Sequence, residues 1–106
     1  MSTAKKPRAQ RREEGRLAAK DIRDRERLAL LEPGGSPEHP IEVVTASLVE
    51  PKARALPCPV CGGAVRVEDH TARTLKGTPL RLAAVVCPMC THKRILYFVI
   101  RPLLLN

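Results

Sequence analysis

Aromatic residues are almost absent from this chain of 106 residues, which contains one tyrosine, one phenylalanine and no tryptophan. Proteins that bind single-stranded nucleic acid without sequence preference stack its bases on aromatic side chains. Any nucleic acid bound here must therefore be held mainly through its phosphate backbone, with weak sequence specificity. Long apolar runs are missing as well: residues 95–100, an unbroken apolar stretch, are far short of the roughly 20 residues that cross a bilayer. We expect no membrane-spanning segment.

The chain also lacks the residue patterns of the common catalytic sites. It has no Ser-His-Asp order, no glycine-rich phosphate loop and no H-E-x-x-H sequence. We therefore expect no enzymatic activity, and no small-molecule substrate is indicated. The first thirty residues are charged and lack the apolar stretch of a secretory signal peptide, which predicts a cytoplasmic protein with reduced thiols.

What the chain does contain is two pairs of cysteines, Cys58 with Cys61 and Cys87 with Cys90, separated by 25 residues. Zn²⁺ prefers four soft ligands in a tetrahedron, and a C-x-x-C turn can direct two sulfurs at one ion. Two alternatives are disulfides, which suit small secreted domains, and a redox C-x-x-C pair, which is typical of a βαβ context. The charged N-terminus and the second matching pair favour one structural Zn²⁺ bound by all four cysteines.

Apolar segments on both sides of the cysteines predict a small sheet, and residues 64–71 show the clean alternation of a half-buried strand. The expected strands are residues 64–71, 80–86 and 94–101, and the β-branched residues of 41–49 predict an added strand before them. Residues 52–56 are expected to be irregular. The strand 94–101 is apolar on both faces, so we expect it to be covered on both, by the added strand or by a partner chain.

The two C-P-x-C knuckles, each beside a predicted hairpin, resemble those of the zinc-ribbon family. The resemblance covers about residues 56–101. It implies a small β-rich zinc-ribbon with a three- to four-stranded antiparallel sheet, one structural Zn²⁺ and nothing catalytic. One departure leaves the shape of the second turn open: Gly62 follows the first knuckle, whereas Thr91 and His92 follow the second.

The composition divides the chain into three parts. Residues 1–31 form a basic, charged arm that is helical or disordered, because good helix formers dominate from Ala9 to Leu31. Residues 32–40 form a linker rich in proline and glycine. Residues 41–106 form the zinc-ribbon domain, with the added strand 41–49 and the ribbon core 58–101.

The charge indicates a polyanionic partner. The chain carries a net charge of +8, and both the arm and the ribbon core are basic. The first function that we consider is binding of RNA or DNA by basic residues of the ribbon, with the arm adding reach. These residues are Arg66, Arg73, Lys76, Arg81, Lys93 and Arg94. The second is a protein-interaction or scaffold role in a larger assembly, through the apolar segment 95–105. The sequence slightly favours nucleic acid, on charge.

Overall fold

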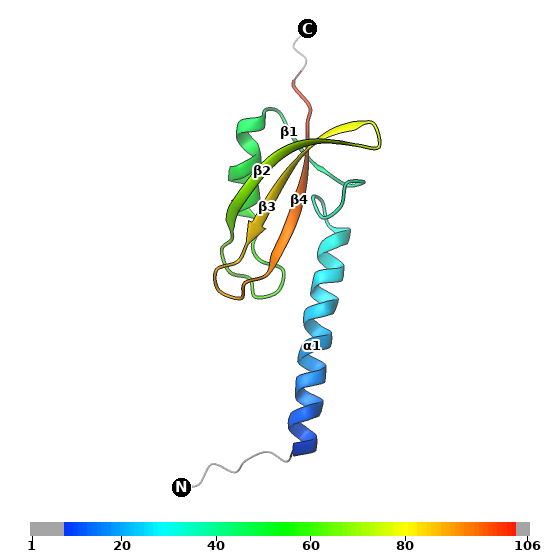
Figure 1. Cartoon of the computed structure of the whole chain (residues 1–106), viewed down its shortest axis with the longest axis vertical. Coiled ribbons are helices and arrows are strands. Elements are labelled where there is room, and N and C mark those ends of the chain that lie inside the picture. Colours follow the sequence, from blue (N-terminus) through cyan, green and yellow to red (C-terminus); the bar gives the residue numbers. More distant parts are fainter. Residues whose placement is uncertain (1–7, 104–106) are drawn as a thin grey trace.

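A four-stranded sheet lies at the centre of the structure, a computed structural model that describes residues 8–103 (Figure 1). The strands lie side by side in the order β1-β4-β3-β2. In chain order the elements are α1 (Arg8–Leu31), β1 (Ile41–Val43), the short 3₁₀ helix η1 (Ala46–Leu48), α2 (Val49–Ala55), β2 (Arg66–Leu75), β3 (Thr78–Val86) and β4 (Lys93–Ile100). The prediction of a small β-rich fold preceded by a helical arm is confirmed.

The strands β2 and β3 form a long antiparallel hairpin closed by Lys76 and Gly77. These two residues have positive φ angles of 50° and 79°. Two such residues in succession make a turn whose twist matches that of the flanking strands. β4 returns antiparallel beside β3, with Leu96 opposite Ala83. The three predicted ribbon strands are therefore present, although β2 begins and ends later than residues 64–71.

The sheet is mixed, which corrects the antiparallel arrangement expected from the sequence. β1 lies parallel to β4, with Ile41 opposite Phe98 and Val43 opposite Ile100. Parallel neighbours need a long connection between them, and here α2 and the β2–β3 hairpin separate β1 from β4 along the chain. The apolar pattern of a strand does not indicate whether it runs parallel or antiparallel to its neighbour. The long connection between β1 and β4 determines the direction of β1.

Most of the predicted strand 41–49 is not a strand. Only its first three residues pair with β4, and η1 and α2 follow. The prediction that residues 52–56 are irregular is wrong for residues 52–55, which belong to α2. Val49 and Ala53 are fully buried and one helical turn apart, so the burial of this apolar side favours a helix over an extended chain. Pro51 is compatible because it lies in the first turn of α2, where its missing N–H leaves no helical bond unmade.

The hydrophobic core lies between α2 and one face of the sheet. Leu96 and Phe98 of β4 are almost completely buried, and Val49 and Ala53 of α2 have no exposed surface. The sequence predicts that β4 is covered on both faces. The structure covers one face with α2 rather than with an added strand, whereas Ile95 on the other face is 44% exposed. The second face of β4 is therefore partly open.

The helix α1 stands away from the sheet along most of its length, and its last turns join it to the domain (Figure 1). Its 24 residues extend over about 36 Å. Ala29, near its C-terminal end, is its only buried residue. The following segment 32–40 is irregular, as predicted, but it is packed against the domain: Gly34 and Gly35 are buried, and the Tyr97 N–H donates to the Gly34 carbonyl at 2.9 Å. This bond attaches the end of α1 to the part of β4 that β1 leaves unpaired.

No helix within residues 8–103 is long and apolar enough to cross a membrane. Two parts of the sequence predictions lie outside these residues. They are the first seven residues of the arm 1–31 and the end of the apolar segment 95–105, at Leu104 and Leu105. Leu103, the last residue described, is 76% exposed.

We expect the junction between α1 and the domain to be sensitive to one methyl group at Gly35. A Cβ atom added there would overlap the Ala29 carbonyl oxygen, so the backbone would have to shift. Gly35→Ala should lower the free energy of unfolding by about 1–3 kcal/mol, the usual cost of overpacking. Gly15→Ala is the matched control, because nothing lies within 4 Å of its added Cβ and alanine is the better helix former. Urea unfolding followed by circular dichroism measures both; equal losses in the two variants would contradict the tight junction.

Candidate metal centre

The two cysteine knuckles have the same backbone geometry. In the first, the Gly62 N–H donates to the Cys58 carbonyl at 2.8 Å, and in the second, the Thr91 N–H donates to the Cys87 carbonyl at the same distance. A second hydrogen bond closes each turn: the N–H of its first cysteine donates to the carbonyl five residues later, at 2.9 Å in both knuckles. The first knuckle follows α2 and the second connects β3 to β4. The fold thus brings two equivalent turns face to face.

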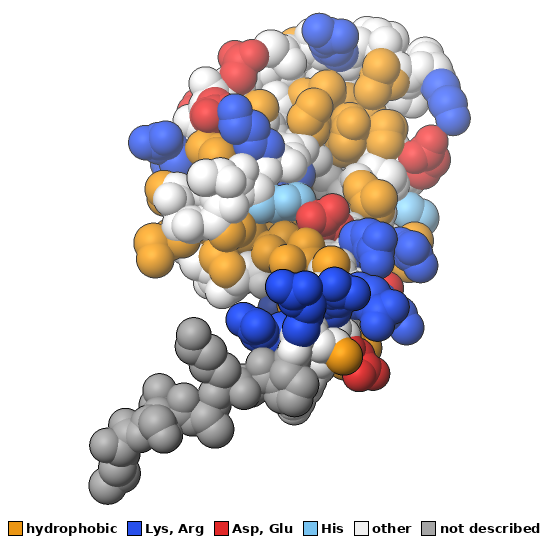
Figure 2. Space-filling view, turned by 60° about the horizontal axis from the view of Figure 1, so that its bottom comes forward, with side chains coloured by type: hydrophobic (Ala, Val, Ile, Leu, Met, Phe, Trp, Pro, Cys, Tyr) orange, Lys and Arg blue, Asp and Glu red, His pale blue; other side chains and the backbone are white. Residues whose placement is uncertain are grey.

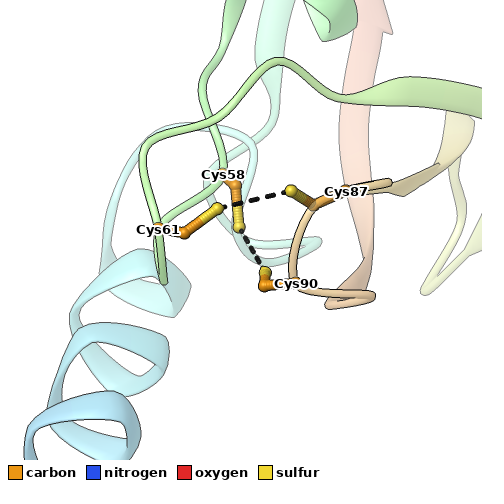
Figure 3. A group of neighbouring side chains, drawn as sticks. All are labelled: Cys58, Cys61, Cys87 and Cys90. Carbon is orange, nitrogen blue, oxygen red and sulfur yellow. Dashed lines mark hydrogen bonds between the residues drawn. The ribbon is translucent and has the colours of Figure 1, made fainter.

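The four thiols converge between the knuckles (Figure 3). Their sulfur atoms all lie within 4.8 Å of one another, and the pairs that face across the knuckles are Cys58–Cys90 at 3.5 Å and Cys61–Cys87 at 3.4 Å. Four Zn–S bonds of about 2.3 Å in a tetrahedron would place the sulfurs about 3.8 Å apart. A disulfide needs about 2.05 Å, so the four cysteines are free thiols. The prediction that these side chains form one cluster able to hold a metal ion is confirmed.

The first cysteine of each knuckle also belongs to the hydrophobic core. Cys58 and Cys87 are buried, whereas Cys90 is half-buried and Cys61 is exposed. The buried pair packs in the same cluster as the side chains of α2 and β4. A metal ion bound here would therefore fix the core at one end, and not only the two surface turns.

Backbone N–H groups point at the sulfurs and change their acidity. Hydrogen bonding from the Cys90 backbone lowers the pKa of the Cys87 thiol to about 7, against the effect of burial. The His92 backbone favours the Cys90 thiolate in the same way, but burial and the neighbouring thiols outweigh it and raise the pKa of Cys90 to about 12. The Gly63 backbone favours the Cys61 thiolate, yet the adjacent Cys87 thiol and burial raise the pKa of Cys61. The Cys87 thiolate therefore forms readily, whereas the thiolates of Cys61 and Cys90 need a cation among them.

Arg94 lies beside this cluster and is half-buried. Its Nη2 donates to the Pro57 carbonyl at 3.2 Å. Burial lowers the pKa of its guanidinium, and the charge of Cys58 opposes this shift. A cation next to the first cysteine offsets the negative charge of thiolates around a metal. The position of Arg94 therefore favours support of the first knuckle over the contact with nucleic acid predicted from the sequence.

The second knuckle takes the shape of the first without its glycine. Gly62 has a φ of 76°, and Thr91, in the equivalent position, has a φ of 64°. A β-branched residue rarely adopts this left-handed conformation. The Thr91 hydroxyl donates to the Cys90 carbonyl at 2.6 Å. The hydrogen bonds that close the second turn therefore hold Thr91 in a strained backbone conformation.

The end of α1 contacts both knuckles. Arg25 Nη1 donates to the Val60 carbonyl of the first knuckle at 2.7 Å. The Glu26 carboxylate lies 3.7 Å from Nδ1 of His92, directly after the second knuckle. Arg25 and Val60 are 35 positions apart in the chain, and no local sequence signal predicts such a contact. The orientation of α1 is thus tied to the closure of the cysteine cluster.

The six basic residues predicted to bind nucleic acid are spread over the sheet rather than gathered in one patch. Arg66 of β2 and Lys93 of β4 both lie opposite Val86, so they flank β3 at the end of the sheet near the cysteines. Arg73 and Lys76 lie at the opposite end, close to or within the hairpin turn. Arg81 of β3 lies opposite Phe98 and is only partly exposed.

Two of these six residues have acidic partners within the domain. The ammonium group of Lys76 lies 3.1 Å from the carboxylate of Glu38, which lowers the pKa of that carboxyl group. Lys93 lies 3.9 Å from Glu68. Such exposed pairs are weak, but each partner reduces the positive charge that the sheet offers to a polyanion.

No protein-family model, curated protein or solved structure matches this chain. Its class therefore follows from its own residues and geometry. It is a small domain with a four-stranded mixed sheet, a covering helix and a projecting helix, and its four cysteines form a cluster that could hold one metal ion.

We expect Thr91→Gly to stabilise the metal-loaded protein by about 0.5–1 kcal/mol. Glycine adopts a positive φ without the steric cost that threonine carries, although it also loses more entropy on folding. The reverse exchange, Gly62→Thr, should destabilise the first knuckle by about 1–2 kcal/mol, because nothing crowds its Cβ and only its φ of 76° opposes the change. Thermal unfolding measures both variants. A loss of stability in Thr91→Gly would show that the hydroxyl bond outweighs the strain.

We expect one metal ion per chain, bound by all four thiols. Cys58→Ser or Cys87→Ser should lower the free energy of unfolding by about 4 kcal/mol or more, because each removes a ligand from a closed site that is coupled to folding. Met89→Ala is the control, since Met89 lies in the second knuckle, is 80% exposed and supplies no ligand. Elemental analysis, the cobalt–thiolate absorption of the Co²⁺-substituted protein and urea unfolding provide the measurements. Full metal content in either serine variant would contradict a four-thiol site.

Proposed function

We propose that the four cysteines bind one structural Zn²⁺ and that the domain, a variant of the zinc-ribbon pattern, binds nucleic acid through its basic surface without catalysis. The two C-P-x-C knuckles with equal turns support the relation to zinc ribbons. The parallel strand β1 and the helix α2 are additions to that pattern.

The donor set supports zinc and a structural role. Four thiolates with roughly tetrahedral spacing suit Zn²⁺, whereas magnesium and calcium prefer oxygen ligands. Catalytic zinc keeps one position open for water or substrate, and here the protein supplies all four ligands. Four free thiols in a metal site suit a reducing compartment, so we place the protein in the cytoplasm.

The observation that carries the nucleic-acid proposal is the exposure of positive charge. The chain has a net charge of +8, and all eight Lys and Arg residues of α1 are exposed. Exposed cations attract a phosphate backbone and release its counterions. Phe98 is buried and Tyr97 half-buried, so the described residues offer no aromatic platform for bases. The charges support binding through the backbone of the nucleic acid.

A scaffold role is the second candidate, because large apolar side chains are exposed in the second knuckle and in the segment 95–105. Met89, Ile95 and Leu103 have 80%, 44% and 76% of their surface exposed. Met89 lies in the second knuckle, and Ile95 and Leu103 are eight residues apart along an extended chain, about 26 Å. Stable protein interfaces are built around a central apolar cluster. These separate residues give the scaffold role weaker support than the charges give nucleic-acid binding.

We expect the zinc-loaded chain to bind mixed-sequence nucleic acid with an affinity that falls at least about a hundredfold between 50 and 200 mM salt, because binding through phosphates releases counterions. Fluorescence anisotropy over a salt series measures it. A variant ending at Pro102 is the control for the second candidate: it should bind as the full chain does. Absence of binding at every salt concentration would refute the nucleic-acid function, and a partner protein lost on truncation would favour the scaffold role.

A further inference from the structure

Five basic residues of α1 lie on one side of the helix. At 100° per residue they fall within about 80° of its circumference, and they extend over about 22 Å of its length. The basic stripe, as we name this set, consists of Arg12, Arg16, Lys20, Arg23 and Arg27. Consecutive members are three or four positions apart, so a cation lies on the same side at every turn.

The basic stripe faces away from the domain. Ala29, the buried residue of α1, and the knuckle contacts Arg25 and Glu26 mark the docked side of the helix. The centre of the stripe lies about 140° around the helix from Ala29, about 180° from Arg25 and about 80° from Glu26. All five stripe residues are exposed. Lys and Arg side chains gather around the end of α1 from which the grey residues run (Figure 2).

The charges of the stripe have no ion-pair partner in the part of the chain that the structure describes. Within residues 8–103, no ion pair joins a stripe residue to an acidic side chain, whereas three basic residues of the sheet and its end have acidic partners. Those three are Lys76, Lys93 and Arg101. The stripe is therefore the largest continuous set of unpaired positive charge on a single element of the described chain.

Acidic residues border the stripe on one flank of α1. Glu13, Asp21 and Asp24 fall on the adjoining sector of the helix, toward the exposed Leu17. A phosphate strand is therefore attracted to the stripe side of the helix and repelled from this flank.

We propose that the basic stripe of α1 is the surface that binds double-helical DNA, with the stripe along one phosphate strand at the edge of the major groove and the acidic flank turned to solvent. This inference rests on the proposed nucleic-acid function and places its main contact on α1 rather than on the ribbon residues expected from the sequence. The major groove of B-form DNA, about 12 Å wide, admits an α-helix, whereas the major groove of duplex RNA is too narrow for side chains to read. Single strands would need the aromatic side chains that this chain lacks.

The test compares two variants of the full zinc-loaded chain from which the same charge is removed. The stripe variant changes all five stripe residues to glutamine, which preserves helix propensity. The sheet variant changes five basic residues outside α1 to glutamine: Arg66, Arg73, Lys76, Arg81 and Lys93. Binding to a mixed-sequence DNA duplex of about two helical turns is measured over a salt series. Helix content by circular dichroism and metal content are measured on both variants.

We expect the stripe variant to bind at least tenfold more weakly at physiological salt. The slope of log K against log salt should become shallower by about 4, since each lost phosphate contact removes about 0.9. The sheet variant should keep a slope within about 1 of the wild-type value. A third variant, in which the four stripe arginines become lysine, should keep most of the binding and the slope, because the charges remain.

The outcomes separate this inference from the function on which it rests. Loss of binding and slope in the sheet variant alone, or equally in both variants, would overturn the stripe as the binding surface while nucleic-acid binding stands. Tighter binding of the single strand or of duplex RNA than of duplex DNA at equal salt would also overturn it. If the wild-type chain binds none of the probes, both the stripe proposal and the nucleic-acid function are overturned. Binding of an acidic protein surface by the stripe in place of DNA would also overturn both.

Discussion

The structure depends on the convergence of four thiols from two turns that are far apart in the chain. Cys58 and Cys61 follow α2, whereas Cys87 and Cys90 join β3 to β4, so the cluster ties the covering helix to the sheet. The remaining core is small, and its largest fully buried side chains include Phe98. Thiols at these separations oppose one another's ionisation, and a cation removes that opposition while closing both turns. A metal ion held by this cluster would therefore also hold the domain together.

The sequence predicts the parts whose information is local. Cysteine spacing predicts the cluster, helix formers predict α1, and apolar segments next to the cysteines predict the three ribbon strands. It fails for α2 and for the direction of β1, because these depend on distant partners. Val49 and Ala53 become a helical face only when the sheet buries them, and the parallel pairing of β1 with β4 is set by the connection of 49 residues between them. The strained turn at Thr91 is visible as a missing glycine, yet its φ is set by the hydrogen bonds of the knuckle.

The basic residues show a second limit of sequence reasoning. A count of charges cannot tell that Lys76 lies beside Glu38 or that Arg94 is turned toward Pro57, since these partners are distant in the chain. Helical periodicity would have grouped the basic residues of α1 on one side. Only the structure shows that this side is exposed to solvent, because the buried side chain of Ala29 and the contact of Arg25 define the side that docks on the domain.

Because α1 is attached to the domain at one end, a small rotation at that end moves its other end over a larger distance. Few contacts attach it. Arg25 and Glu26 contact the knuckles, Ala29 is buried in the junction, and the Tyr97 N–H bonds to the Gly34 carbonyl. Because the helix is about 36 Å long, a tilt of about 10° at these contacts moves its free end by about 6 Å. A displacement of one knuckle relative to the other, too small to alter the sheet, is thus enlarged at the far end of α1. The direction in which α1 projects therefore depends in part on the geometry of the two knuckles.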